Sequence, residues 1–205
     1  MIRETRNAST RRTAILEAAR NIFLRESYTG ASMESVAQEA GVSKQTVYNH
    51  FANKDELFRA LVLDICSQFG ATLSELSRYV EQPPEEMLAV FGDVVLKKMS
   101  CPDIMRLHRL LQLEGRNHPS LAETFYKLGP DNIARWLTDY LETKVQSGEM
   151  QIEDTRIAAE QFVTMLMGHL RLRHLLGFTA APDKQQRASY VASAVTIFLN
   201  GVRPR

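Results

Sequence analysis

The chain has 205 residues, of which 44% are hydrophobic and 24% are charged. This composition is typical of a globular protein and excludes a disordered or fibrous chain. The length is enough for one large domain or two small ones, with a core that needs no disulfide or metal ion for stability. The formal net charge of +1 excludes a protein that attracts polyanions through its overall charge.

Apolar residues recur at helical spacing along most of the chain, and no segment shows strand-like alternation between hairpin turns. Ser32, Ser43 and Asn53 are typical helix N-caps, Gly41 and Gly148 are typical helix ends, and prolines open several later segments. The sequence therefore predicts an all-α fold. The expected helices run over 10–26, 33–40, 44–50, 53–78, from 83–84 onward, 102–117, 119–128, 131–146, 154–176 and 183–200.

Residues 33–52 read MESVAQEAGVSKQTVYNHFA, which predicts two short helices joined by a tight turn. Ala37 is small enough for the helices to approach closely, and Gly41 can adopt a positive φ without a Cβ clash. Val47 would pack the second helix onto the first. This spacing is typical of the helix-turn-helix motif, in which the second helix enters the major groove of DNA.

The second helix of this motif would expose a polar face suited to nucleic acid. Its amide, ammonium and hydroxyl groups can bond base edges or phosphates, and the helix N-termini at Ser32, Ser43 and Lys54 would present backbone N–H groups to phosphates. The predicted DNA-binding residues are Ser32, Ser43, Lys44, Gln45, Thr46, Tyr48, Asn49, His50 and Lys54.

The run from Thr10 to Leu57, above all GVSKQTVYNHFANKDELF at 41–58, closely resembles the DNA-binding domain of the TetR family of transcriptional regulators. The resemblance implies a TetR-like fold, with a three-helix DNA-binding domain at 1–60 and a helical ligand-binding and dimerisation domain at 61–205. It implies phosphate contacts at Tyr48, His50 and Lys54, and base contacts elsewhere on the second helix. Tyr28 departs from the small or polar residue that the family often has there.

Residues 105–130, MRLHRLLQLEGRNHPSLAETFYKLGP, resemble more weakly the C-terminal domain of AefR-like members of that family. The resemblance implies a pocket for a small molecule, and methionine and aromatic side chains suit a plastic apolar pocket. Taken singly, each of these residues is more often part of an ordinary core, and the resemblance implies that some of them line the pocket. The candidate ligand-binding residues are Phe91, Met105, His108, Phe125, Tyr126, Trp136 and Phe162.

The last two helices are candidates for a dimer interface. The helix that begins near Ile157 is apolar over most of its circumference, which indicates packing against more than one partner. The family dimerises through the corresponding helices, and a two-fold dimer suits a pseudo-palindromic operator. The predicted interface residues are Phe162, Leu166, Leu170, Val191, Val195 and Phe198.

Together these features predict a homodimeric repressor that binds double-stranded operator DNA and responds to a small, at least partly apolar effector. We expect no enzyme activity, no cofactor, no metal and no membrane span, and a cytoplasmic location, since no apolar run nears the roughly 20 residues of a span. The alternatives are an activator, a redox- or metal-responsive regulator using histidines or Cys66 and Cys101, and, more remotely, a helical enzyme. Glu114 and His118, four residues apart, are a weak metal-ligand pair for that last case.

Overall fold

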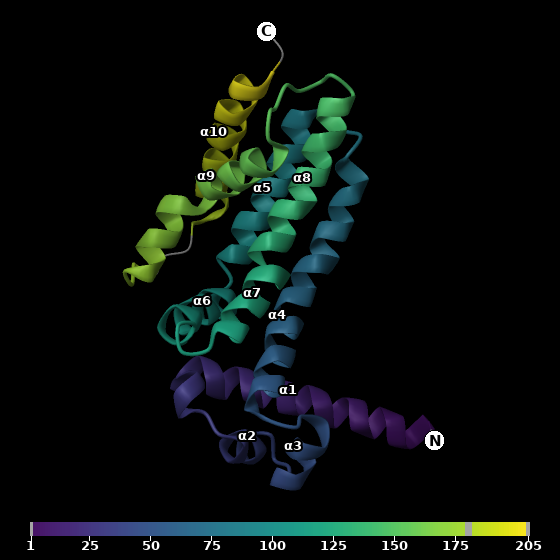
Figure 1. The fold of residues 1–205 in the computed structure, drawn as a ribbon, viewed down its shortest axis with the longest axis vertical. Helices are drawn as coiled ribbons and strands as arrows, with labels where there is room; N and C mark the ends of the chain where they lie inside the picture. The colour runs from purple at the N-terminus through teal and green to yellow at the C-terminus, as the bar shows by residue number, and fades with distance from the viewer. Residues whose placement is uncertain (1, 179–181, 204–205) are drawn as a thin grey trace. The chain divides into compact units, whose positions relative to one another are not determined.

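The computed structural model describes residues 2–178 and 182–203. Over these residues it contains ten α-helices, one short 3-10 helix and no strand, which confirms the all-α prediction (Figure 1). The chain forms two compact units. Unit 1 comprises the chain up to Ser67 together with Arg106–Leu128, and unit 2 comprises Gln68–Met105 together with the chain from Gly129 onward. The predicted boundary near residue 60 lies in α4, the helix within which the chain passes from unit 1 to unit 2.

Unit 1 holds the predicted helix-turn-helix, and its caps are those that the sequence predicts. The Ser32 hydroxyl accepts a hydrogen bond from the Ser35 amide (3.0 Å), and the Ser43 hydroxyl accepts one from the Thr46 amide (3.1 Å). Asn53 likewise caps the next helix by accepting from the Glu56 amide (2.9 Å). The helices of this unit are α1 (Ile2–Gly30), α2 (Met33–Glu39), α3 (Lys44–His50), the first part of α4 (Lys54–Leu76), most of α6 (Pro102–Glu114), and α7 (Pro119–Leu128).

The first helix differs from its predicted bounds at both ends, and its C-terminal end contains a sharp break. Ser27 has φ 72° and ψ 173°, so the helical path is interrupted there although helical hydrogen bonds resume up to Gly30. A positive φ is uncommon outside glycine and costs on the order of 1–3 kcal/mol. The break turns the next side chain, Tyr28, into the core of unit 1.

Tyr28 is the centre of an aromatic cluster that fastens α1 to α4. Its ring lies 5.8 Å from that of Phe23, stacked, and 5.4 Å from that of Phe58, edge-on. Its hydroxyl donates to the carboxylate of Asp55 at the start of α4. Burial, together with this hydrogen bond, raises the pKa of Tyr28 well above its usual value, so the phenol stays protonated.

Unit 2 is a bundle of α5 (Pro84–Met99), α8 (Pro130–Gln146), α9 (Thr155–Leu175) and α10 (Lys184–Val202), preceded by the 3-10 helix Ser77–Tyr79. The helix α9 packs on α5, α8 and α10, and α10 packs on α5. The approach of α5 to the last two helices is close. A Cβ atom added at Gly92 would lie 2.9 Å from Cγ1 of Val191 and 3.3 Å from Cδ2 of Leu166. Only glycine fits this position of α5 without displacing the opposing helices.

We therefore expect Gly92→Ala to destabilise unit 2, although alanine is the better helix former. Overpacking a well-filled core typically costs about 1–3 kcal/mol, and the β-branched Val191 has little freedom to move aside. Chemical denaturation at fixed protein concentration measures the change. Gly201→Ala is the matched control, because an added Cβ there meets no atom; equal stability of the two variants would contradict the close approach.

Candidate nucleic-acid interface

The turn between α2 and α3 has the geometry of a helix-turn-helix. Gly41 has φ 65°, as its predicted role requires, and the Val42 amide donates to the Ala37 carbonyl (3.0 Å) to close the turn. Val47 on α3 is completely buried, and Ala37 on α2 is nearly so. The buried faces of the two helices thereby fix which side of α3 remains at the surface.

The outer face of α3 carries the residues predicted to read bases. Gln45 and Asn49 are exposed, and their side chains are joined by a hydrogen bond from Nε2 of Gln45 to Oδ1 of Asn49 (3.0 Å). Tyr48 is 40% exposed. The Thr46 hydroxyl lies 2.8 Å from the Ser43 hydroxyl and so takes part in the cap of α3. The predicted DNA-facing set therefore lies on one accessible surface, with Thr46 partly engaged in the cap.

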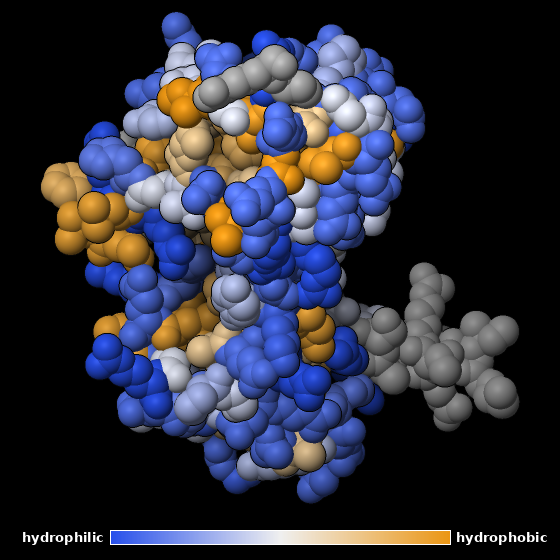
Figure 2. All heavy atoms as spheres, turned by 45° about the horizontal axis from the view of Figure 1, so that its top comes forward, coloured by the Kyte–Doolittle hydropathy of each residue, from blue (hydrophilic) through white to orange (hydrophobic). Residues whose placement is uncertain are grey.

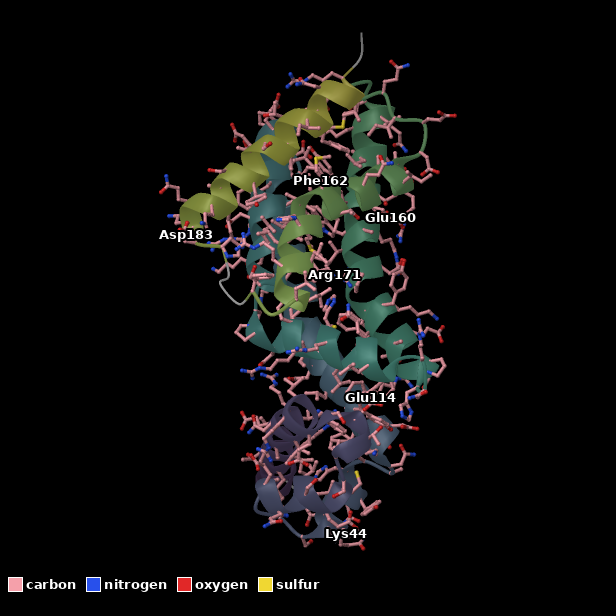
Figure 3. The ribbon with its side chains drawn as sticks, turned by 90° about the vertical axis from the view of Figure 1, so that its left-hand side faces the viewer. Lys44, Glu114, Glu160, Phe162, Arg171 and Asp183 are labelled. Carbon is pink, nitrogen blue, oxygen red and sulfur yellow. The ribbon has the colours of Figure 1, made fainter. Side chains whose placement is uncertain are left out.

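Lys44, at the N-terminal end of α3, forms an ion pair with Glu34 of α2 (Figure 3). Its ammonium also lies 5.7 Å from the centre of the Tyr48 ring. The pair raises the pKa of Lys44 and lowers the pKa of Glu34. Since both side chains are more than half exposed, solvent screens this pair, and the lysine can exchange its partner for a phosphate. Sequence reasoning missed Glu34, because no local spacing joins positions ten residues apart on separate helices.

Two predicted phosphate contacts have additional partners inside the protein. The ammonium of Lys54 donates to the carbonyls of Tyr28 (3.0 Å) and Ala31 (3.1 Å) and lies 4.5 Å from the Tyr28 ring centre. Two of its three donors thus hold the connection between α1 and α2 against α4, which leaves one for a phosphate. His50 is half-buried beside Phe51. The DNA contacts of both residues therefore stay predictions. Lys54 also has a structural role in holding the connection between α1 and α2.

The connection between α1 and α2 is also held by Glu114, at the end of α6 and in the same unit. The Thr29 amide donates to Oε1 of Glu114 (3.1 Å), and the Thr29 hydroxyl donates to Oε2 (2.9 Å). The ring of His118, at the start of α7, lies 4.4 Å from that of Tyr28. Glu114 is labelled in Figure 3. We call the group Thr29, Glu114, Tyr28 and His118 the loop clamp.

Hydrogen bonding keeps the clamp carboxylate ionised. The hydrogen bond from the Thr29 backbone N–H is the main cause that lowers the pKa of Glu114, despite the burial of this side chain. Hydrogen bonds from the Thr29 and Ser27 hydroxyls and the charge of the nearby His118 lower it further. Because the pKa of Glu114 is lower in the folded state than in the unfolded chain, its contribution to the free energy of unfolding is complete above the unfolded-state pKa. That contribution is lost as the pH falls through the folded-state pKa. The clamp is therefore closed throughout the neutral range. Its hydrogen bonds also account for Glu114 without any metal.

The candidate ligand-binding residues fall into two groups, one in each unit. In unit 2, Phe91 stacks on Trp136 (5.5 Å between ring centres, 11° between planes) and lies 6.2 Å from Phe162. In unit 1, the buried His108 meets Phe125 edge-on (4.7 Å). Met105, which belongs to unit 2, is also buried, whereas Tyr126 in unit 1 is half exposed.

The predicted dimer residues are mostly in the interior of unit 2. Five of them are buried within the subunit, and Leu170 is partly so; the five are Phe162, Leu166, Val191, Val195 and Phe198. Figure 3 shows Phe162 between α9 and its neighbours, while Glu160 and Arg171 lie at the surface of the same helix. These side chains fill the core of their own subunit, so their role in a dimer interface stays a prediction.

The alternatives of a redox- or metal-responsive regulator have little support in the residues that the structure describes. Burial raises the pKa of Cys66 to about 11, so at neutral pH its thiol is protonated and a weak nucleophile. Among the residues that the structure describes, no three His, Cys, Asp or Glu side chains are arranged to hold a metal ion. Within those same residues, no helix is long and apolar enough to cross a membrane.

A capped α3 that exposes amide, ammonium and phenol groups beside a glycine turn defines a helix-turn-helix regulator of transcription. The comparisons with known proteins agree. Residues 15–61 match the bacterial regulatory proteins of the tetR family, and residues 86–201 match the C-terminal domain of AefR-like transcriptional repressors. The chain belongs to the TetR family of DNA-binding transcriptional regulators.

Individual relatives cover nearly the whole chain. The HTH-type transcriptional regulator UidR of Escherichia coli K12 is 39% identical over 95% of this chain and 94% of its own length. A TetR-family regulator from Mesorhizobium loti has the same fold, with a TM-score of 0.86 and 24% identity over 96% of this chain and 98% of that one. The flavonoid-responsive regulator FrrA has a TM-score of 0.79 and 26% identity, covering 96% and 99%. All three relatives are described as regulators.

The Lys44–Glu34 pair generates a prediction about DNA binding. The resemblance places Lys44 among the base contacts, but an ammonium at the N-terminal end of α3 can also reach a phosphate. In that case, neutralising the carboxylate in Glu34→Gln should let Lys44 engage phosphate fully, and binding should tighten on all sequences. The slope of log K against log salt should steepen by up to about 0.9, the value for one more phosphate contact. Fluorescence-anisotropy titrations over a salt series measure both quantities.

Glu123→Gln is the matched control for this test. It also releases a lysine from an ion pair, with Lys127 on α7, but it leaves α3 unaltered. An unchanged salt slope in Glu34→Gln, or an equal change in both variants, would show that Lys44 makes no phosphate contact that Glu34 limits.

Proposed function

We propose that this regulator is a homodimeric repressor that holds a pseudo-palindromic operator and releases it when a small, largely apolar molecule binds. We propose further that it acts by binding alone, without catalysis. The observation that carries the proposal is the pairing of an accessible recognition helix, α3, with a clamp that ties the α1–α2 connection to α6. A device of this kind makes DNA affinity depend on the state of another helix.

Dimerisation is supported by the outward faces of α9 and α10. Leu172 on α9 is 52% exposed and Ile197 on α10 is 59% exposed, and Met165 and Tyr190 lie at helical spacing from them. Hydrophobic side chains at the surface are visible in Figure 2. Apolar residues of this size repeated along two packed helices favour coverage by another apolar surface. A second copy is the occupant we propose, because an isologous contact between these helices would give the two-fold symmetry of a palindromic operator.

We expect Leu172→Glu combined with Ile197→Glu to convert the dimer to a monomer, since four carboxylates would otherwise be buried in the interface. Loss of the second half-site contact should lower operator affinity on the order of 100-fold. Sedimentation velocity gives the oligomeric state, and anisotropy gives the affinity.

Leu113→Glu is the control for the dimer variant. Leu113 is 70% exposed, but it lies on α6 in unit 1. It should leave both the oligomeric state and operator binding intact. A double variant that stayed dimeric would place the interface elsewhere.

An aromatic effector is favoured by the cluster of Phe91, Trp136 and Phe162. Trp136 is half-exposed while its partner Phe91 is completely buried, so the indole forms the accessible edge of the cluster. Planar aromatic molecules can stack on such a surface. The structural relative FrrA is described as flavonoid-responsive, which makes flavonoids a rational first set of probes. Trp136 is the sole tryptophan of the chain, so its fluorescence reports on binding there.

The clamp supplies the proposed link from effector to DNA. The helix α6 begins in unit 2 and ends in unit 1 at Glu114, so a displacement along it would act on the Thr29 amide and hydroxyl. Opening these bonds would release the strained connection at Ser27 and with it the position of α2 and α3. An effector that binds the open form better would shift the population toward weak DNA binding.

The experiment that tests the proposal uses an operator recovered by selection from random DNA with the full-length protein. A flavonoid that quenches Trp136 should also lower operator affinity in the wild type. Glu114→Gln should retain the quenching, since it lies outside the aromatic cluster. It should lower operator affinity roughly fivefold or more without effector, and it should reduce the further loss that the effector causes, because the clamp is already weakened.

Thr29→Val provides a graded comparison, because it removes one of the two donors and keeps the shape. Its effects should lie between those of the wild type and Glu114→Gln. If the effector released DNA equally well from all three proteins, the clamp would not be the coupling element. If no compound that quenches Trp136 altered DNA binding, the aromatic cluster would not be an effector site.

A further inference from the structure

The recognition helix offers fewer independent base-reading groups than its sequence implies. Lys44 is paired with Glu34, and Thr46 is engaged with the Ser43 cap. The remaining pair of amides, Gln45 and Asn49, is one helical turn apart and fully on the exposed side of α3. Their mutual hydrogen bond of 3.0 Å holds the two side chains together as one group.

The bond between the amides determines what the pair can present to DNA. The bond uses one N–H of Gln45 and one lone pair of the Asn49 oxygen. The two atoms that it leaves wholly uncommitted are the Gln45 carbonyl oxygen, an acceptor, and the Asn49 amide nitrogen, a donor. If both amides were turned over, the pair would still have one uncommitted donor atom and one uncommitted acceptor atom. The chemical complement of the pair is therefore the same in either orientation.

Of the four bases, adenine matches this complement in the major groove. Adenine offers an acceptor at N7 beside a donor at its 6-amino group. Guanine offers two acceptors, cytosine a donor, and thymine an acceptor beside a methyl group. We propose that Gln45 and Asn49 act as a single unit that reads one adenine in each operator half-site. The proposal rests on α3 being the helix that enters the major groove.

Holding the two side chains together in advance also favours the contact. A free glutamine loses several rotamers when it binds a base, and this entropy loss weakens binding. Here the partner amide has already restricted both side chains. Removal of either amide should therefore cost nearly as much as removal of both, whereas two independent readers would give additive losses.

The test begins with operators selected from random DNA by the full-length protein. Each adenine of a half-site is then replaced in turn by 7-deazaadenine, which lacks N7, or by purine, which lacks the 6-amino group. At one position per half-site, both replacements should weaken binding by roughly 5- to 100-fold. In Gln45→Ala and in Asn49→Ala, this penalty should disappear, and the double variant should bind as weakly as the weaker single variant.

Tyr48→Phe is the control on the same helix. It removes a proposed backbone contact, so it should weaken binding to every sequence while leaving the 7-deazaadenine penalty at its wild-type size. Additive losses with penalties at two different base positions would overturn the proposal and show that each amide reads its own base. A selected half-site with no adenine sensitive to both replacements would also overturn it. Binding that is indifferent to sequence would instead refute α3 as a specific reader.

Discussion

The burial of the Tyr28 side chain is the constraint from which the geometry of unit 1 follows. For the ring to reach Phe23 and Phe58, the chain has to leave the path of α1 abruptly, and Ser27 adopts an unfavourable backbone conformation to allow this. Every other contact of the connection offsets that strain: Asp55 accepts from the phenol, Lys54 donates to two carbonyls, and Glu114 accepts from Thr29. The helix α2 begins directly after this connection and α3 packs on α2, so the placement of both depends on it.

In unit 2, the last two helices divide their apolar residues between two surfaces. One face carries Phe162, Leu166 and Val191, which fill the core and come so close to α5 that only glycine fits at position 92. The other face carries residues such as Leu172 and Ile197 that the subunit itself does not cover. Tight packing on the inner face therefore fixes the direction in which the outer residues point.

The sequence predicts the features that depend on neighbouring residues. The caps at Ser32, Ser43 and Asn53, the turn at Gly41 and the bounds of α3 all follow from local chemistry, and the resemblance of residues 10–57 extends them to a family. Periodicity identified α9 as apolar on most sides, but it could not say which side faces the subunit core. The clamp could not be predicted from the sequence, because Thr29 and Glu114 are 85 positions apart. Nothing in the local pattern distinguishes a capping glutamate from a solvent-exposed one. The Gln45–Asn49 bond needed side-chain geometry, although the spacing of four residues was visible.

The discontinuity of unit 1 has a consequence for protein engineering. Chimeric regulators are commonly imagined as a reading head exchanged at a single junction, but here the head includes Arg106–Leu128 from much later in the chain. A transplant of the first 67 residues alone would bring the Ser27 turn and the Thr29 donors without the carboxylate that satisfies them. An exchange that kept these contacts would need two segments at once, whereas recombination at one breakpoint would separate Thr29 from Glu114.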